Sequence, residues 1–214
     1  MERQFPVKAS AAQQGFSLVE LLVVMAIIGI LLGLSVPALT SLTESNNLAR
    51  SGQIIADEIN LARQLSSSRN ATIQMRLFKL AGATTSGYTA LQLFTSDSTG
   101  TMQAVSRLAQ LPKSMAISEN TTVSSALGAT AFATPSTMPA GSGPTAGATY
   151  LPFEFRPSGV VTPVLNANGL SNMSSYCLTV LPARFAASTN ATLPKNYVII
   201  QINPVTATPL VYRP

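Results

Sequence analysis

Apolar residues fill one stretch near the start of the chain almost without interruption. From Phe16 to about Pro37 nearly every residue is apolar. At a rise of 1.5 Å per residue, such a stretch extends over roughly 33 Å as a helix, which is enough to cross the hydrocarbon core of a bilayer. The pattern therefore predicts a membrane-spanning helical segment over residues 16–37.

Residues 38–69 continue this helix with a different pattern. Apolar and small residues recur there at spacings of three and four, which is typical of an amphipathic helix. We expect this half to lay its apolar face on a sheet. The residues of that face are Leu48, Gly52, Ile54, Ile55, Ile59, Leu61, Ala62 and Leu65.

The remainder, residues 70–214, predicts a β-rich globular domain. Residues 71–77 alternate, with Ile73, Met75 and Leu77 on one face and Arg76 on the other, as in a half-buried strand. Residues 120–149 hold no charged residue and are rich in small and hydroxyl side chains, which predicts a long loop rather than core. Further strands are expected at 88–94, 102–111, 150–162, 176–181, 196–203 and, as an edge strand, 209–214.

The length and composition fit one globular domain and a helix. The 214 residues carry only 10% charged side chains and a net charge of +5, without a run of basic residues. Such a chain permits weak attraction to DNA or anionic surfaces but does not require it.

Several kinds of chemistry are missing from the chain. It has no histidine, which is the usual general base and the commonest metal ligand, and one cysteine, Cys177, which excludes an intrachain disulfide and zinc clusters. The acidic residues are scattered and no phosphate-binding glycine loop is present. The sequence therefore predicts no enzyme, no metal site and no cofactor.

Glu20 stands out because it is an ionisable residue within the apolar stretch. A carboxylate in hydrocarbon costs free energy unless a cation or hydrogen-bond donors accompany it, so such a residue is by default a functional candidate. The alternative without a specific function for Glu20 is an ordinary signal anchor that tolerates one glutamate near its end.

The residues around Glu20 resemble a known signal. Gly15-Phe16-Ser17-Leu18-Val19-Glu20, followed by Leu-Leu-Val-Val-Met-Ala-Ile-Ile, is similar to the processing and assembly signal of type IV pilins and type II secretion pseudopilins. The resemblance implies a leader, residues 1–15, that a membrane peptidase removes after Gly15, and N-methylation of Phe16. It also implies that Glu20 serves assembly and that the helix bends at Pro37.

The same resemblance implies an α+β fold, the pilin fold, with a long N-terminal helix packed on an antiparallel sheet. Cleavage before Phe16 would create an ammonium about one helical turn from Glu20. Our hypothesis is that Glu20 pairs with this amine, either within one subunit or between neighbouring subunits.

A second, shorter resemblance lies in Phe155-Arg156-Pro157-Ser158-Gly159, which is similar to the Phe-x-Pro-x-Gly hairpin of GspH/FimT-like minor pseudopilins. Proline fixes φ and glycine accepts a positive φ, so the same residues also make a generic hairpin unaided. Both interpretations stay open at this point.

The leading functional hypothesis is a structural subunit, a minor pilin or pseudopilin of a type IV pilus or a type II secretion pseudopilus. Its partners would be other pilin subunits, the prepilin peptidase and the inner membrane. The chain would cross that membrane once, with a cytoplasmic N-terminus, before entering a periplasmic or extracellular filament.

Two alternatives remain from the sequence. One is a minor pilin that binds DNA for uptake, for which the candidate contacts are Arg156, Arg184, Lys195 and Arg213. The other is an uncleaved, single-pass, membrane-anchored periplasmic protein.

Overall fold

The computed structural model describes residues 16–80, 87–128, 143–144, 148–163, 176–187 and 193–214, without the side chains of residues 34–40, 128 and 163. The chain divides into two units, Met1–Leu42 and Thr43–Pro214. The predicted leader, residues 1–15, and parts of the predicted loop 120–149 lie outside the described residues.

A single long helix, α1 (Leu18–Arg69), begins in the first unit and ends in the second. Its described large apolar side chains in the first unit are between 44% and 81% exposed. Within the described residues, no helix has both the length and the hydropathy that crossing a membrane requires. The helix is continuous through Pro37, whose side chain is not described, so the bend at this residue stays a prediction.

The second unit contains two antiparallel sheets. Sheet A has the strand order β3-β2-β1-β6-β7, with β4 paired to β2, and sheet B has the order β10-β9-β8-β5. The α+β fold class, with a helix followed by antiparallel sheets, is thus confirmed. The strands are β1 (Ile73–Lys79), β2 (Ala90–Ser96), β3 (Met102–Ala104), β4 (Ala109–Gln110), β5 (Met115–Ile117), β6 (Thr149–Phe155), β7 (Val161–Pro163), β8 (Tyr176–Pro182), β9 (Val198–Ile202) and β10 (Pro209–Tyr212).

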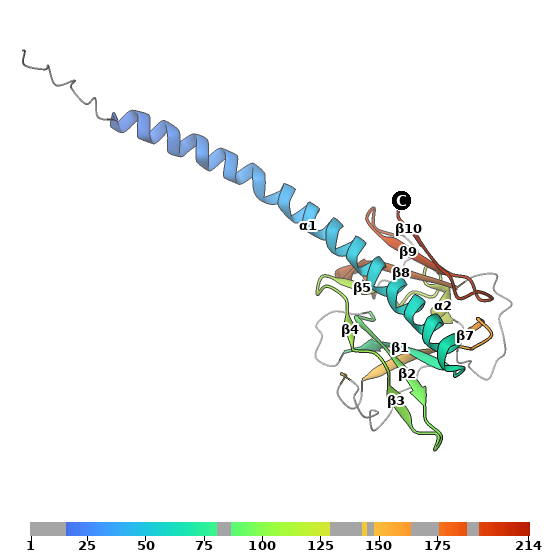
Figure 1. Cartoon of the computed structure of the whole chain (residues 1–214). Helices are drawn as coiled ribbons and strands as arrows, with labels where there is room; N and C mark the ends of the chain where they lie inside the picture. The colour runs from blue at the N-terminus through green and yellow to red at the C-terminus, as the bar shows by residue number, and fades with distance from the viewer. Residues whose placement is uncertain (1–15, 81–86, 129–142, 145–147, 164–175, 188–192) are drawn as a thin grey trace, which may run out of the picture. The chain divides into compact units, whose positions relative to one another are not determined.

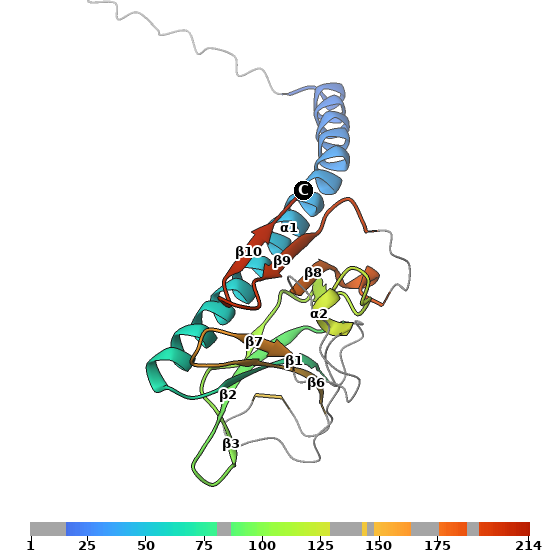
Figure 2. The same cartoon turned by 90° about the vertical axis from the view of Figure 1, so that its right-hand side faces the viewer.

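The second half of α1 supplies one wall of the main core. Leu48, Ile55, Ile59 and Ala62 are fully buried, as the spacing of apolar residues predicts, and they form one cluster with inward-facing residues of both sheets. Strands β9 and β10 lie alongside the helix (Figure 2), where Gly52 lets Val198 and Val211 approach closely. Burial of this face, rather than intrinsic propensity, stabilises most of such a helix.

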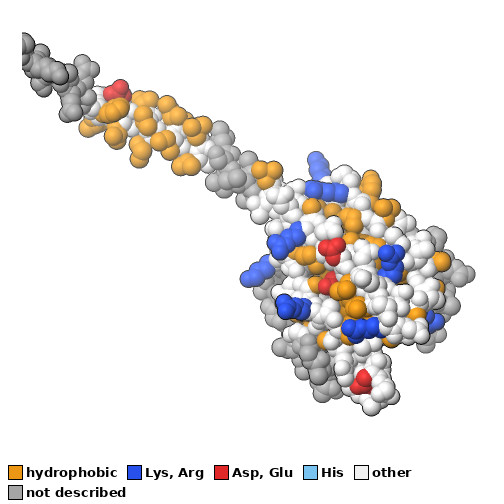
Figure 3. Space-filling view, viewed as in Figure 1, with side chains coloured by type: hydrophobic (Ala, Val, Ile, Leu, Met, Phe, Trp, Pro, Cys, Tyr) orange, Lys and Arg blue, Asp and Glu red, His pale blue; other side chains and the backbone are white. Residues whose placement is uncertain are grey.

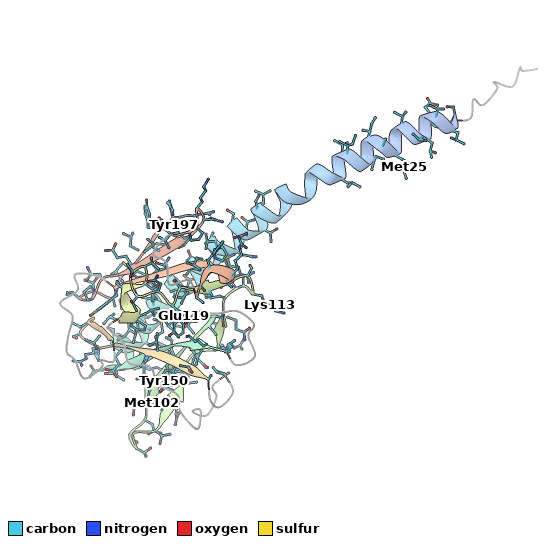
Figure 4. All side chains as sticks on the ribbon, turned by 180° about the vertical axis from the view of Figure 1, so that it is seen from behind. Met25, Met102, Lys113, Glu119, Tyr150 and Tyr197 are labelled. Carbon is cyan, nitrogen blue, oxygen red and sulfur yellow. The ribbon has the colours of Figure 1, made fainter. Side chains whose placement is uncertain are left out.

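The outer face of sheet A is also covered, which the sequence did not reveal. Arg76 is only 5% exposed, and its guanidinium lies 4.4 Å from the ring centroid of Phe94 and 4.3 Å from that of Tyr150. Phe78 completes this second apolar cluster, to which Met102 packs on the same side of the domain (Figure 4). The prediction of a half-buried strand was therefore wrong for β1, because aromatic residues of neighbouring strands cover its other face.

Part of the predicted loop 120–149 is ordered core. The short helix α2 (Ser125–Gly128) packs on β8, and Ser124 and Ala126 are fully buried. Strand β5 pairs with β8 only from Val180 onward. Before Val180, serine hydroxyls accept hydrogen bonds from backbone N–H groups of β8. The Oγ atom of Ser124 accepts a hydrogen bond from the backbone N–H of Thr179 at 3.1 Å. The Oγ atom of Ser125 accepts one from the backbone N–H of Cys177, also at 3.1 Å.

Sheet B is covered more fully on one face than on the other. Strand β9 lies between β8 and β10, yet Ile199 is only half-buried and Gln201 is exposed. One face of β9 is therefore only partly covered, and β10 is an edge strand as predicted. The Cys177 side chain is half-buried.

The turn between β2 and β3 is organised by one exposed carboxylate. Asp97 Oδ1 accepts hydrogen bonds from the Thr99 hydroxyl (2.6 Å), from the Thr99 N–H (2.8 Å) and from the Thr101 N–H (2.9 Å). These bonds, led by that from the Thr99 side chain, lower the pKa of Asp97 below its ordinary value of 3.8. The charged form of Asp97 therefore favours the folded turn.

We predict that Asp97→Asn weakens the acid sensitivity of the domain. Because the folded-state pKa is depressed, its contribution is complete above the unfolded-state pKa and is lost as the pH falls through the folded-state value. Thermal unfolding followed from neutral pH to about pH 2 should show a smaller pH-dependent loss for Asp97→Asn than for the wild type. Ser98→Ala, in the same turn, should behave like the wild type; parallel curves for all three proteins would contradict the assignment.

We predict that Gly52→Ala destabilises the domain although alanine favours helices. A Cβ at residue 52 would lie 2.9 Å from Cγ1 of the buried Val198. Overpacking of this kind costs about 1–3 kcal/mol, against about 1 kcal/mol gained in helix propensity, so we expect a net loss of about 1 kcal/mol in denaturant unfolding. The double variant with Val198→Ala should recover part of the loss, and Gly29→Ala, with open space around its Cβ, should show none.

Candidate assembly site

The start of α1 is closed by two reciprocal hydrogen bonds. The backbone N–H of Glu20 donates to Ser17 Oγ at 3.2 Å, and the backbone N–H of Ser17 donates to Glu20 Oε2 at 3.3 Å. Ser17 is thus the N-cap and Glu20 the third helical residue of a capping box. The serine and the glutamate three residues later are visible in the sequence, but their pairing as a cap was missed there.

Glu20 is the only charged residue between Phe16 and Gly33. The apolar side chains of this segment are exposed, and the face drawn in Figure 3 shows them along its length. A helix that is apolar on all sides is ordinarily covered by protein or by lipid. The segment therefore combines an apolar surface in need of a partner with one carboxylate at its start.

The other predicted processing residues are placed only in part. Phe16 is described and is 83% exposed, whereas Gly15 lies outside the described residues. Cleavage after Gly15, methylation of Phe16 and the assembly role of Glu20 accordingly stay predictions.

The four basic residues predicted as nucleic-acid contacts do not form one cluster through any described contact. Arg184 Nη2 lies 2.9 Å from Glu44 Oε1, and Arg213 donates a hydrogen bond to the Ser45 hydroxyl. Arg156 and Lys195 are exposed, and no contact within the described part of the chain joins them to this pair. Two of the four side chains thus bind the domain's own helix.

These contacts define an anchoring turn of α1 that the sequence did not reveal. Besides Glu44 and Ser45, Asn47 donates a hydrogen bond to the Ser114 hydroxyl at 3.3 Å. The partners come from the loop before β5, the 3₁₀ helix Ala183–Phe185 and the C-terminal tail. They join residues far apart in sequence, and only the tertiary fold brings them together.

A cavity of about 630 Å³ lies between the end of α1 and the turn after β6. Most of its lining residues carry hydroxyl or amide side chains, and Arg63 is the charged residue among them. The turn contains Gly159 at φ 89°, so the glycine supplies the positive φ that the sequence predicts. The remaining lining residues are Asn60, Gln64, Ser66, Ser67, Ser68, Pro157 and Ser158.

No catalytic or metal centre is apparent among the described side chains. Within that part of the chain, no three histidine, cysteine, aspartate or glutamate residues gather as metal ligands. Among the described residues, the Oε2 atom of Glu58 is buried and has no hydrogen-bond partner. Burial raises the pKa of Glu58, opposed by a hydrogen bond from Ser106 and assisted by Asp57.

Comparisons with known proteins identify the N-terminal segment. Residues 10–36 match the family model of the prokaryotic N-terminal methylation motif. The predicted prepilin-type signal is thereby confirmed over these residues. The motif implies a precursor anchored in the inner membrane, processed by the prepilin peptidase and assembled with other pilin subunits.

One solved structure is similar to the chain: the minor pseudopilin EpsH from the Type 2 Secretion System of Vibrio cholerae. The identity is 9% and the TM-score 0.41, with 78% of this chain and 96% of that chain covered. At these values the likeness assigns no role to the chain. No curated protein matches it.

We predict that Glu58→Gln stabilises the domain at neutral pH. A raised folded-state pKa means that ionisation is penalised in the fold, so the wild type gains stability as the pH falls from that value toward the unfolded-state pKa. Glutamine keeps the shape without the charge, and we expect a gain of up to about 1 kcal/mol, or about 2–4 °C in Tm. Asp57→Asn, at the exposed neighbouring position, should change little; equal shifts for both variants would contradict the burial argument.

Proposed function

We propose that the protein is a prepilin-like subunit, a minor pilin or pseudopilin of a type IV pilus or a type II secretion pseudopilus. The peptidase removes residues 1–15, Phe16 is methylated, and the mature chain enters a filament through its N-terminal helix. The observation that carries this proposal is the exposed apolar segment at the start of α1, which directly follows Phe16, contains Glu20 and lies within the matched methylation motif.

The physical reason is that this surface is unfavourable in water. Apolar surface contributes roughly 25 cal/mol per Å² when it is removed from water. The thirteen large apolar side chains described as exposed on α1 in the first unit therefore favour a membrane before assembly and neighbouring helices afterwards. The globular unit, by contrast, has its own hydrophobic core, and we propose that it remains outside the membrane. Work of this kind needs helix packing and surface display, not bond chemistry, so we propose no enzymatic activity.

Glu20 gives the segment a specific partner. A carboxylate in an apolar environment is tolerated when an opposite charge is near, and a methylated N-terminal amine keeps its positive charge. We propose that the amine of Phe16 supplies that charge. This pairing connects processing to assembly, because the amine does not exist until the leader has been removed.

The processing step is tested by intact-mass measurement of the full chain purified from its own cells in detergent. The expected product lacks residues 1–15 and carries one methyl group on Phe16, whereas Gly15→Val should retain the leader. A wild-type protein that keeps residues 1–15 would overturn the proposal and favour a plain membrane anchor.

The assembly step is tested by Glu20→Ala. This variant should be cleaved, methylated and membrane-held, but absent from sheared filaments or periplasmic pseudopili, because its amine has no counter-charge. Asp57→Ala, an exposed acidic position on the same helix, is the matched control and should assemble normally. Normal incorporation of Glu20→Ala would show that the carboxylate is not needed.

A further inference from the structure

Four basic residues lie at the end of the globular unit at which α1 enters it. Arg184 and Arg213 bind the anchoring turn of α1. Lys113, which is labelled in Figure 4, directly precedes Ser114, whose hydroxyl accepts a hydrogen bond from the same turn. Arg50 lies on α1 within one helical turn of the anchoring turn. Together the four residues form the basic end of the unit.

The charge of the basic end is largely uncompensated. All four side chains are exposed, that of Arg184 to 62% despite its ion pair with Glu44. Among the described residues, Glu44 is the one acidic residue that forms an ion pair with this group. The next acidic residue along α1, Asp57, lies about two helical turns beyond Arg50. Four cations against one carboxylate therefore leave a net charge of +3 at this end.

Exposed aromatic rings accompany these cations. The ring of Phe185 is 40% exposed, and the Arg184 guanidinium lies 4.8 Å from its centroid. Tyr212, which directly precedes Arg213, is 56% exposed. Basic side chains next to aromatic rings are typical of the interface between membrane and water, where the cations meet lipid phosphates and the rings lie among the headgroups. The chemistry of this end therefore fits the headgroup layer of an anionic membrane.

The length of the chain brings this end within reach of such a layer. In the proposed precursor the apolar segment crosses the membrane as far as about Pro37, and six residues, 38–43, separate Pro37 from Glu44. Because α1 is continuous there, these residues extend over about 10 Å. The headgroup layer on each side of the hydrocarbon core is about 5–8 Å thick. The anchoring turn is thus about one headgroup layer away from the hydrocarbon.

We propose that the basic end of the globular unit docks onto the phosphate groups of anionic lipids before the subunit enters a filament. This inference rests on the membrane stage of the proposed function and adds an ionic contact to the apolar one. The docked unit is held at the membrane surface, and assembly has to break these contacts as the subunit leaves the membrane.

Lipid is the occupant that the observations favour over a second copy of this chain. A second copy would have to present a matching acidic patch. Its carboxylates lie instead on different elements, with Asp57 on α1, Asp97 in the turn after β2 and Glu154 on β6. A membrane surface, by contrast, offers many phosphates at the depth that the length of residues 38–43 sets.

The test uses the full chain reconstituted into nanodiscs, with a fluorescent amino acid in place of the exposed Ala187, two residues after Phe185. A nitroxide on a small fraction of the lipid headgroups quenches the fluorophore when the unit is docked. Quenching should be strong in phosphatidylglycerol discs and weak in phosphatidylcholine discs. It should also fall between about 50 mM and about 500 mM salt, because ions screen exposed charges. Equal quenching in both lipids, or quenching that salt does not change, would overturn the inference.

Charge variants assign the docking to the basic end. Arg50→Gln combined with Lys113→Gln removes two cations that bind no described side chain, so the fold should be retained. A basic residue at an anionic surface contributes about 1 kcal/mol, so the ratio of docked to undocked protein should fall about fivefold for each charge. The matched control, Arg107→Gln combined with Arg156→Gln, removes two exposed cations from sheet A loops and should leave the ratio unchanged. An equal fall in both double variants would overturn the assignment to this end.

The remaining outcomes separate this inference from the proposed function. Cross-links from Lys113 to acidic residues of another subunit, without quenching by lipid, would identify a protein contact and overturn the inference. A normally processed, filament-forming chain without quenching overturns only the docking. An intact leader overturns the proposed processing, yet leaves an anchored chain on which lipid docking is still measured.

Discussion

The start of helix α1 combines two requirements that an isolated chain does not satisfy. Its apolar side chains are exposed in the first unit, and a single carboxylate, Glu20, begins that surface. Exposure of the apolar surface to water is unfavourable, and so is transfer of the charged carboxylate into an apolar environment. The methylated amine that we propose at Phe16 would permit the charge to enter an apolar environment as half of a neutral pair. The neighbouring helices of the proposed filament would cover the apolar surface.

The second half of the same helix packs against partners within its own chain. Ile55, Ile59 and Ala62 pack against both sheets, and Gly52 permits close approach of β9 and β10. Polar contacts at Glu44 and Ser45 bind the helix where it enters this unit. One helix thus has a half whose packing is completed by its own domain and a half whose packing must come from other molecules.

The sequence predicts what depends on local pattern. The long helix, its apolar face at Leu48, Ile55 and Ile59, and the Gly159 turn follow from periodicity and turn chemistry. Most strands do so too, except that β5 was not predicted and that β3 and β4 were predicted as one strand. The capping box was equally local, since a serine and a glutamate three residues apart carry it, but the resemblance to a processing signal drew attention to the charge and not to the hydrogen bonds.

Features that depend on distant residues were not predicted. Arg76 alternates as a solvent-facing residue does, yet rings from β2 and β6 bury it. Ser124 and Ser125 belong to a low-complexity stretch, yet their hydroxyls complete the hydrogen bonding of β8 where β5 has ended. In each case the sequence shows the residue type, and the tertiary partner decides whether it is exposed or buried.

The central claim is that other subunits cover the apolar segment of α1. A photo-crosslinking amino acid in place of Ile27, an exposed position of that segment, tests it in living cells. The account predicts cross-links to the N-terminal helices of other filament subunits, which disappear when Glu20→Ala is added. Adducts with lipid alone, identical with and without Glu20, would contradict it.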